Sequence, residues 1–65
     1  MPKIVVYQYE AYDPAARRWY VTDRMGTEEA IQLAGGVPLR RTALAIDGDR
    51  VDAKGFLIGS PDNPN

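Results

Sequence analysis

The chain has 65 residues, a formal net charge of −1, and neither cysteine nor histidine. Without cysteine it has no disulfides or thiolate metal sites, and without histidine it lacks the commonest general base and metal ligand. The balanced charge gives no global field that attracts nucleic acid or an anionic membrane, and no apolar run approaches the roughly 20 residues that span a bilayer. At this length one hydrophobic core is barely sufficient, so a partner subunit is the remaining way to bury more surface.

Five of the six aromatic residues lie between Tyr7 and Tyr20, in a stretch that predicts a β-hairpin. Residues 3–12 are rich in β-branched and aromatic side chains, which fit a pleated strand. Residues 13–16 (Asp-Pro-Ala-Ala) predict the turn, because proline presets φ and the aspartate can accept from backbone N–H groups ahead of it. Residues 17–22 then form the returning strand.

This turn predicts a register in which Tyr12 lies opposite Arg17 and Glu10 lies opposite Trp19. Alternation along the strands then places large apolar side chains on both faces of the hairpin. One face carries Val5, Tyr7, Tyr9, Ala11, Arg18 and Tyr20, and the other carries Ile4, Val6, Gln8, Glu10, Tyr12, Arg17, Trp19 and Val21.

A short helix is predicted over residues 28–34. Thr27 is a suitable N-cap, and the two glutamates that follow it favour the positive end of the helix dipole. Gly35 is the expected left-handed residue that ends the helix. Its apolar stripe is predicted to consist of Ala30, Leu33 and Ala34, with Ile31 at the edge.

The last third of the chain predicts one or two further strands. Residues 39–47 alternate moderately and predict a strand, and the Asp-Gly pair in residues 47–50 predicts a second hairpin turn. Residues 51–58 predict a short strand or a covering segment, broken at Gly55. Residues 60–65 contain two prolines and no apolar residue, and are expected to be a disordered tail.

The predicted fold is therefore α+β, with the order ββαβ(β). It is a small antiparallel sheet of three or four strands with one short helix on one face, forming a single domain over residues 1–59. One helix leaves the other face of the sheet to water or to another chain. Because large rings lie on both faces, another chain is the better expectation.

No catalytic, cofactor or metal site is predicted. Ser60 has no histidine to activate it, and Glu28 and Glu29 point in different directions from adjacent helix positions. Asp47, Asp49 and Asp52 resemble a cation-binding turn, but their spacing departs from a calcium loop, and the interpretation we adopt is a solvated turn.

An arginine and aromatic surface is the basis of an alternative function, that of a small nucleic-acid-binding regulator, and such a surface suits single-stranded nucleic acid. This alternative requires Arg17 and Arg18 to converge in space with Arg40 and Arg41, since phosphate pairing and base stacking must act together. The arginines available for it are Arg17, Arg18, Arg24, Arg40 and Arg41, and the rings are Tyr12, Trp19 and Tyr20.

The function expected from the sequence is that of a small cytoplasmic, non-catalytic module that self-associates as a homodimer and binds another protein. No signal peptide pattern begins the sequence, and no membrane contact is expected. The predicted interaction surface consists of Tyr7, Tyr9, Tyr12, Arg17, Trp19 and Tyr20.

Overall fold

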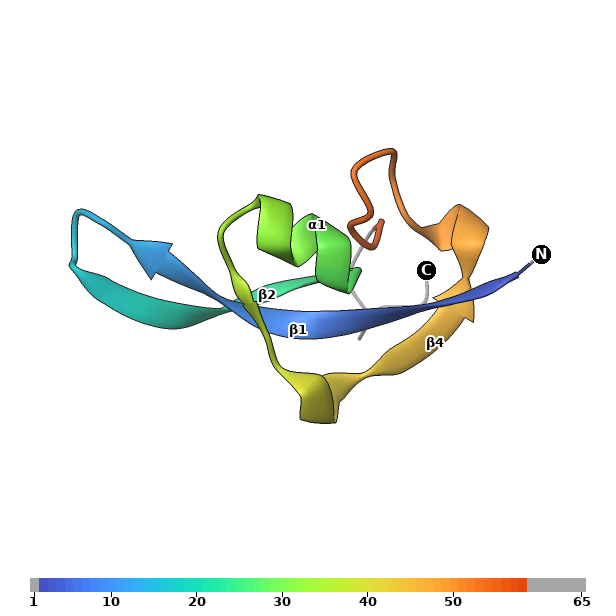
Figure 1. Ribbon diagram of the computed structural model, residues 1–65, viewed down its shortest axis with the longest axis horizontal. Helices are drawn as coiled ribbons and strands as arrows, with labels where there is room; N and C mark the ends of the chain where they lie inside the picture. The colour runs from blue at the N-terminus through green and yellow to red at the C-terminus, as the bar shows by residue number, and fades with distance from the viewer. Residues whose placement is uncertain (1, 59–65) are drawn as a thin grey trace.

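The computed structural model describes residues 2–58, which are organised around one long central strand (Figure 1). Strands β2 (Arg18–Gly26) and β3 (Val37–Pro38) flank this strand, β1 (Lys3–Asp13), and β4 (Leu44–Asp47) also pairs with it, all of them antiparallel. The predicted α+β class and the ββαβ order are confirmed. The elements are β1 (Lys3–Asp13), β2 (Arg18–Gly26), α1 (Glu28–Leu33), β3 (Val37–Pro38), β4 (Leu44–Asp47), and the 3-10 turns η1 (Arg40–Thr42) and η2 (Gly48–Arg50).

The hairpin between β1 and β2 closes one residue later than predicted. Asp13 stays in the ladder opposite Arg18, and Tyr12 lies opposite Trp19. The Asp13 carboxylate accepts from the backbone N–H groups of the two alanines after the proline, and Arg17 takes a left-handed φ of 56° to close the turn. The predicted register was therefore wrong by two residues, but a shift of two keeps every side chain on its predicted face.

A bulge divides the hairpin into two parts. Gln8 lies opposite Met25 and Glu10 lies opposite Val21, so residues 22–24 face a single residue of β1. The Thr22 hydroxyl accepts from the N–H of Arg24 at 3.2 Å and stabilises this bulge. We call residues 10–21, beyond the bulge, the outer hairpin, and the remainder of β1 and β2 the inner hairpin.

The strand predicted over residues 39–47 is interrupted. Its first part curls into η1, and only Leu44–Asp47 pairs with the start of β1. At the interruption the N–H of Leu39 donates to the Gln8 carbonyl at 2.8 Å, and the N–H of Gln8 donates to the Thr42 hydroxyl at 2.8 Å. A side-chain hydroxyl thus takes the place of a backbone carbonyl as the acceptor in the strand ladder. The alternation of apolar residues in the sequence gives no sign of this substitution.

The second predicted hairpin does not form. The Asp-Gly pair begins the 3-10 turn η2, and Val51 then bridges Leu57 instead of pairing with β4. The N–H of Leu57 donates to the Met25 carbonyl at 2.8 Å, so residues 56–57 lie along β2. Gly55 breaks the segment as predicted, with a φ of 96°. The predicted tail, residues 60–65, lies outside the described residues.

Two small hydrophobic clusters lie on opposite faces of the inner hairpin. Val6 and Tyr9 are both buried and, because side chains alternate along a strand, they point to opposite faces of β1. The inner hairpin is therefore covered on both faces by its own chain, and the face expected to stay open is closed there. One cluster contains Val6, Met25, Ile46 and Leu57, and the other contains Tyr9, Ala30, Ile31 and Phe56.

Helix α1 forms the lid over the second cluster. The Thr27 hydroxyl accepts from the N–H of Ala30 at 3.1 Å, and Gly35 has a φ of 81°, so both predicted ends are confirmed. The predicted stripe is rotated, however. Ala30 and Ile31 are buried, whereas Leu33 is 91% exposed. No helix within residues 2–58 is long and apolar enough to cross a membrane.

Candidate interaction surface

The outer hairpin projects beyond the helix and beyond residues 51–58, which we call the covering segment (Figure 1). Helix α1 has only six residues, a length of about 9 Å, and it covers the sheet around Tyr9. Beyond this point the large side chains are left partly in water. Tyr12, Trp19, Tyr20 and Val21 are 46%, 48%, 49% and 53% exposed.

Both faces of the outer hairpin carry apolar side chains. On one face the Tyr12 and Trp19 rings meet edge to face with centroids 5.4 Å apart, and Val21 lies on the same side opposite Glu10. On the other face Tyr20 lies opposite Ala11. The ring pair contributes about 0.5–1.5 kcal/mol beyond its burial, which holds the two rings in a fixed arrangement. The surface is thus pre-ordered and apolar without being covered.

The outer hairpin also has an open edge. Within residues 2–58, the backbone of β2 pairs on its far side only near Met25 and Gly26, with the segment that contains Phe56 and Leu57. From Arg18 to Val21 that edge has no strand beside it among these residues. An exposed edge next to exposed rings offers both hydrogen bonds and apolar area to a partner.

The predicted interaction residues separate into two groups. Tyr9 is buried between α1 and Phe56, with the two rings 5.8 Å apart, and it belongs to the core. Tyr7 is half-buried beneath the guanidinium of Arg40, at 5.8 Å from its ring centroid. The outer hairpin carries the other four: Tyr12 and Trp19 in contact on one face, Tyr20 on the opposite face, and Arg17 in the turn.

Val21 belongs to the same surface, although it was not among the residues predicted for it. Its position two residues from Trp19 places it on the Trp19 face, so strand alternation alone contains the signal that identifies it. The exposure of Leu33 has no such signal, because its spacing fits the apolar side of the helix.

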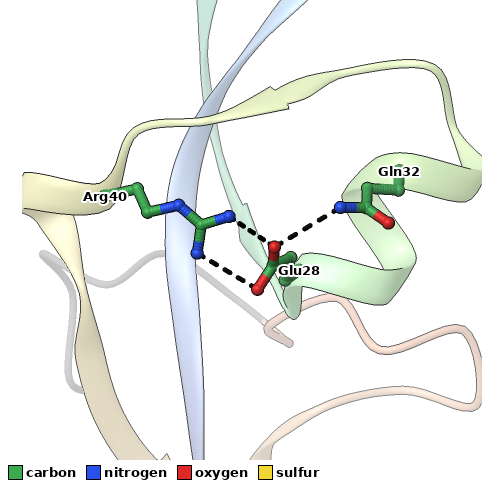
Figure 2. A network of polar contacts seen from close by, with 3 residues as sticks. All are labelled: Glu28, Gln32 and Arg40. Atoms are coloured by element: carbon green, nitrogen blue, oxygen red, sulfur yellow. Dashed lines mark hydrogen bonds and ion pairs between the residues drawn. The ribbon is translucent and has the colours of Figure 1, made fainter.

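Arg40 is engaged in a polar network that ties η1 to α1 (Figure 2). Its guanidinium donates to both carboxylate oxygens of Glu28, with the contact to Oε1 at 3.1 Å, and Gln32 donates to Oε2 at 3.4 Å. The hydrogen bond from Arg40 lowers the pKa of Glu28. Glu28 in turn raises the pKa of Arg40, so this arginine is matched by a charge of its own chain.

The two arginine pairs required for nucleic-acid binding are not brought together. Arg18 lies opposite Asp13 in the ladder, at the outer end of β1. The turn η1, which contains Arg40 and Arg41, lies beside Gln8. Five strand residues, about 16 Å, separate those two positions along β1.

Two acidic residues of the C-terminal third, Asp47 and Asp52, serve the fold. Lys3 donates to Asp47 at 2.8 Å and lowers the pKa of that carboxyl. Asp52 accepts from the N–H groups of Phe56 and Lys54 at 3.0 and 2.9 Å, which lowers its pKa. No group of three or more acidic side chains capable of holding a metal ion occurs within residues 2–58.

A shallow groove of about 780 Å³ runs between α1 and the covering segment. Its floor is apolar, and the Arg24 guanidinium lies over the Phe56 ring at 4.7 Å from the centroid. The lining residues include Tyr9, Arg24, Ala30, Leu33, Lys54 and Phe56. The groove holds charges of both signs, since Asp52 also lines it, and it indicates no particular ligand.

The comparisons with known proteins identify no relative. The chain matches no protein-family model, and searches of curated proteins and of solved structures find no match for it.

Proposed function

We propose that the chain is a small, non-catalytic protein-interaction module that forms a homodimer through its outer hairpin and acts in the cytoplasm. One observation carries the proposal. Tyr12, Trp19, Tyr20 and Val21 are each about half exposed on a ribbon that neither the helix nor the covering segment reaches. On one face the Tyr12 and Trp19 rings are in contact and Val21 is their neighbour along β2, and exposed apolar surface of this kind marks interaction sites in small proteins.

The composition of the surface supports a binding role. Tyrosine and tryptophan are enriched at protein interfaces because they bury a large area while losing few rotamers. Arg17 and Arg18 adjoin the rings in sequence and are exposed, which is the arrangement of a polar rim around an apolar centre.

The energetics of a two-stranded ribbon point in the same direction. An isolated hairpin is marginally stable in water and requires packing against other elements. Beyond the bulge, the two strands have each other and the Tyr12–Trp19 contact for support. A second copy would supply the missing packing surface, which also answers the shortage of core expected for a 65-residue chain.

Light scattering on a concentration series tests the proposal. The wild-type chain of 7.2 kDa should give twice that mass at high concentration. Trp19→Ala should remain folded by circular dichroism and shift the dimer to monomer midpoint upward by tenfold or more, because it removes the central ring. Leu33→Ala is the matched control, since Leu33 is 91% exposed on the helix, and it should leave the midpoint unchanged.

Two results would contradict the proposal. A wild-type chain that stays at 7.2 kDa across the series would remove the homodimer. A folded Trp19→Ala variant with an unchanged midpoint would remove the outer hairpin as its interface. Salt-sensitive binding of single-stranded nucleic acid by a monomeric chain would favour the alternative function instead.

A further inference from the structure

We infer that the two copies pair edge to edge, with β2 antiparallel to β2 of the second copy and a two-fold axis that passes between the two Tyr20 residues. This inference rests on the proposed function and specifies how the homodimer is built. It follows from the direction of the backbone groups of β2, from the registers that a two-fold axis allows, and from the charges along the strand.

The free edge of β2 offers the backbone groups of alternate residues. In an antiparallel strand, the N–H and C=O of one residue point to the same edge, and those of the next residue point to the other edge. Gln8 directs both groups towards Leu39 and Thr42, away from β2. Glu10 and Tyr12 share this direction because they are two and four residues further along β1.

The partners of Glu10 and Tyr12 across the ladder are Val21 and Trp19. They therefore form the pairs that exchange no hydrogen bond with β1, and their own N–H and C=O groups point to the free edge. The close approach of the Tyr12 and Trp19 rings, at 5.4 Å, agrees with this kind of pair, which brings side chains nearer together. Trp19 and Val21, which alternate along β2 with Tyr20 between them, thus present backbone groups that have no strand partner within residues 2–58.

A two-fold axis perpendicular to the sheet places the same face of both copies on the same side of the joint sheet. Residues that lie opposite each other must then be an even number of positions apart in the sequence. Three registers then involve this edge, centred on Trp19, Tyr20 or Val21. Centring on Val21 sets Trp19 opposite Asp23 of the second copy, so the ladder would have to include the bulge at residues 22–24. Centring on Trp19 draws Arg17 into the ladder, although its left-handed φ of 56° is not that of a strand.

The register centred on Tyr20 has neither defect. Trp19 lies opposite Val21 of the second copy, and the reverse pair forms on the other side of the axis, giving two aromatic to β-branched pairs. The groups of Trp19 and Val21 that point outwards become mutual hydrogen-bond partners. The Arg17 end of one strand meets the Asp23 end of the other, so opposite charges approach at both ends of the contact.

The resulting sheet is continuous across the two copies. Each copy uses the same edge of β2, so the assembly stops at a dimer. On one face a row runs from Tyr12 through Trp19 to Val21 of the second copy, and on the other face the two Tyr20 rings meet. The bulge at residues 22–24 ends the straight part of the edge, which restricts pairing to a few residues and disfavours other registers. The contact is isologous, the usual kind for a dimer.

A cysteine at the axis tests this register, in a chain that contains no other cysteine. At the axis the two Cβ atoms of residue 20 would be about 4.5–5.5 Å apart, close to the separation that a disulfide spans. Tyr20→Cys should therefore convert most of the chain to a covalent dimer under mild oxidation, read on non-reducing electrophoresis. Arg18→Cys is the matched control, because that residue also lies two positions from the axis, so its two copies would be about 13 Å apart and should not link.

Amide hydrogen exchange on the wild-type chain gives a second test without any substitution. As the concentration rises from monomer to dimer, the amides of Trp19 and Val21 should slow by tenfold or more. The amide of Tyr20, already bonded to β1, should change much less. If light scattering shows a dimer while Tyr20→Cys fails to link or Arg18→Cys links instead, the edge register is overturned and the proposed function stands. Unchanged exchange of Trp19 and Val21 in that dimer also overturns the register, and a chain that remains monomeric overturns both.

Discussion

The inner and outer parts of one hairpin have similar side chains and opposite surroundings. In the inner hairpin, Val6 is fully buried and Tyr9 is 7% exposed, because α1 covers one face and Ile46 with Leu57 covers the other. In the outer hairpin, Trp19 and Tyr20 are about half exposed. The difference is how far the rest of the chain reaches along the ribbon, and it separates residues that fold the protein from residues that are free to bind.

The largest effect is expected from removing the fully buried helix side chain that packs on the inner hairpin. Ile31→Ala leaves a cavity against Tyr9 and Phe56 and should lower the free energy of unfolding by about 2–5 kcal/mol. Trp19→Ala, measured where the chain is monomeric, should cost only about 1 kcal/mol, mainly through the lost ring pair. Urea unfolding followed by circular dichroism compares them, and equal losses would contradict the division into inner and outer parts.

The next effect concerns the segment that covers the inner hairpin. Gly55 has a φ of 96°, and a Cβ there would lie 2.8 Å from the Thr27 hydroxyl and 3.0 Å from the Ala30 Cβ. Gly55→Ala should therefore cost about 2–4 kcal/mol, from backbone strain and crowding together. Gly35→Ala is the matched control, because its φ is 81° but its surroundings are open, and it should cost about 1–2 kcal/mol. A similar loss of unfolding free energy in the two variants would contradict the expected contribution of crowding at Gly55.

A smaller effect is expected at the start of the helix. Thr27→Ala removes the hydroxyl that accepts from the N–H of Ala30 and should cost about 1 kcal/mol. Thr27→Ser keeps the acceptor and should retain most of the stability. Both variants should leave the dimer midpoint unchanged once folding is complete, and a shift in that midpoint would mean that the helix contributes to the interface.

The local features of the fold could be predicted from the sequence, whereas the contacts between distant segments could not. Alternation predicted the faces of the hairpin, and Thr27 and Gly35 predicted the helix ends, because these signals are local. The side-chain hydroxyl of Thr42 that interrupts a strand, and the bridge from Val51 to Leu57 in place of a hairpin, depend on contacts between distant segments. The sequence also contains nothing that shows where along the ribbon a six-residue helix stops covering it.

The smallest effect is a dependence of stability on pH. The pKa values of Glu28, Asp47 and Asp52 are lowered by the Arg40 guanidinium, the Lys3 ammonium and the Phe56 N–H, respectively. A carboxyl with a lower pKa in the folded state stabilises the fold above its unfolded pKa, and this stabilisation is lost as the pH falls through the folded value. The urea midpoint should therefore fall as the pH drops below about 4. Asp52→Asn should reduce the fall, and a midpoint that rises on acidification would contradict the assigned pairs.

The fluorescence of Trp19, the only tryptophan of the chain, tests the central claim most directly because it reports from the proposed surface itself. At low concentration its half-exposed indole should emit at the longer wavelength typical of contact with water. As the concentration rises, the emission should move to shorter wavelength, with the same midpoint as the increase in mass by light scattering. An emission that remains that of a water-exposed indole at every concentration would contradict the assignment of the outer hairpin as the interface.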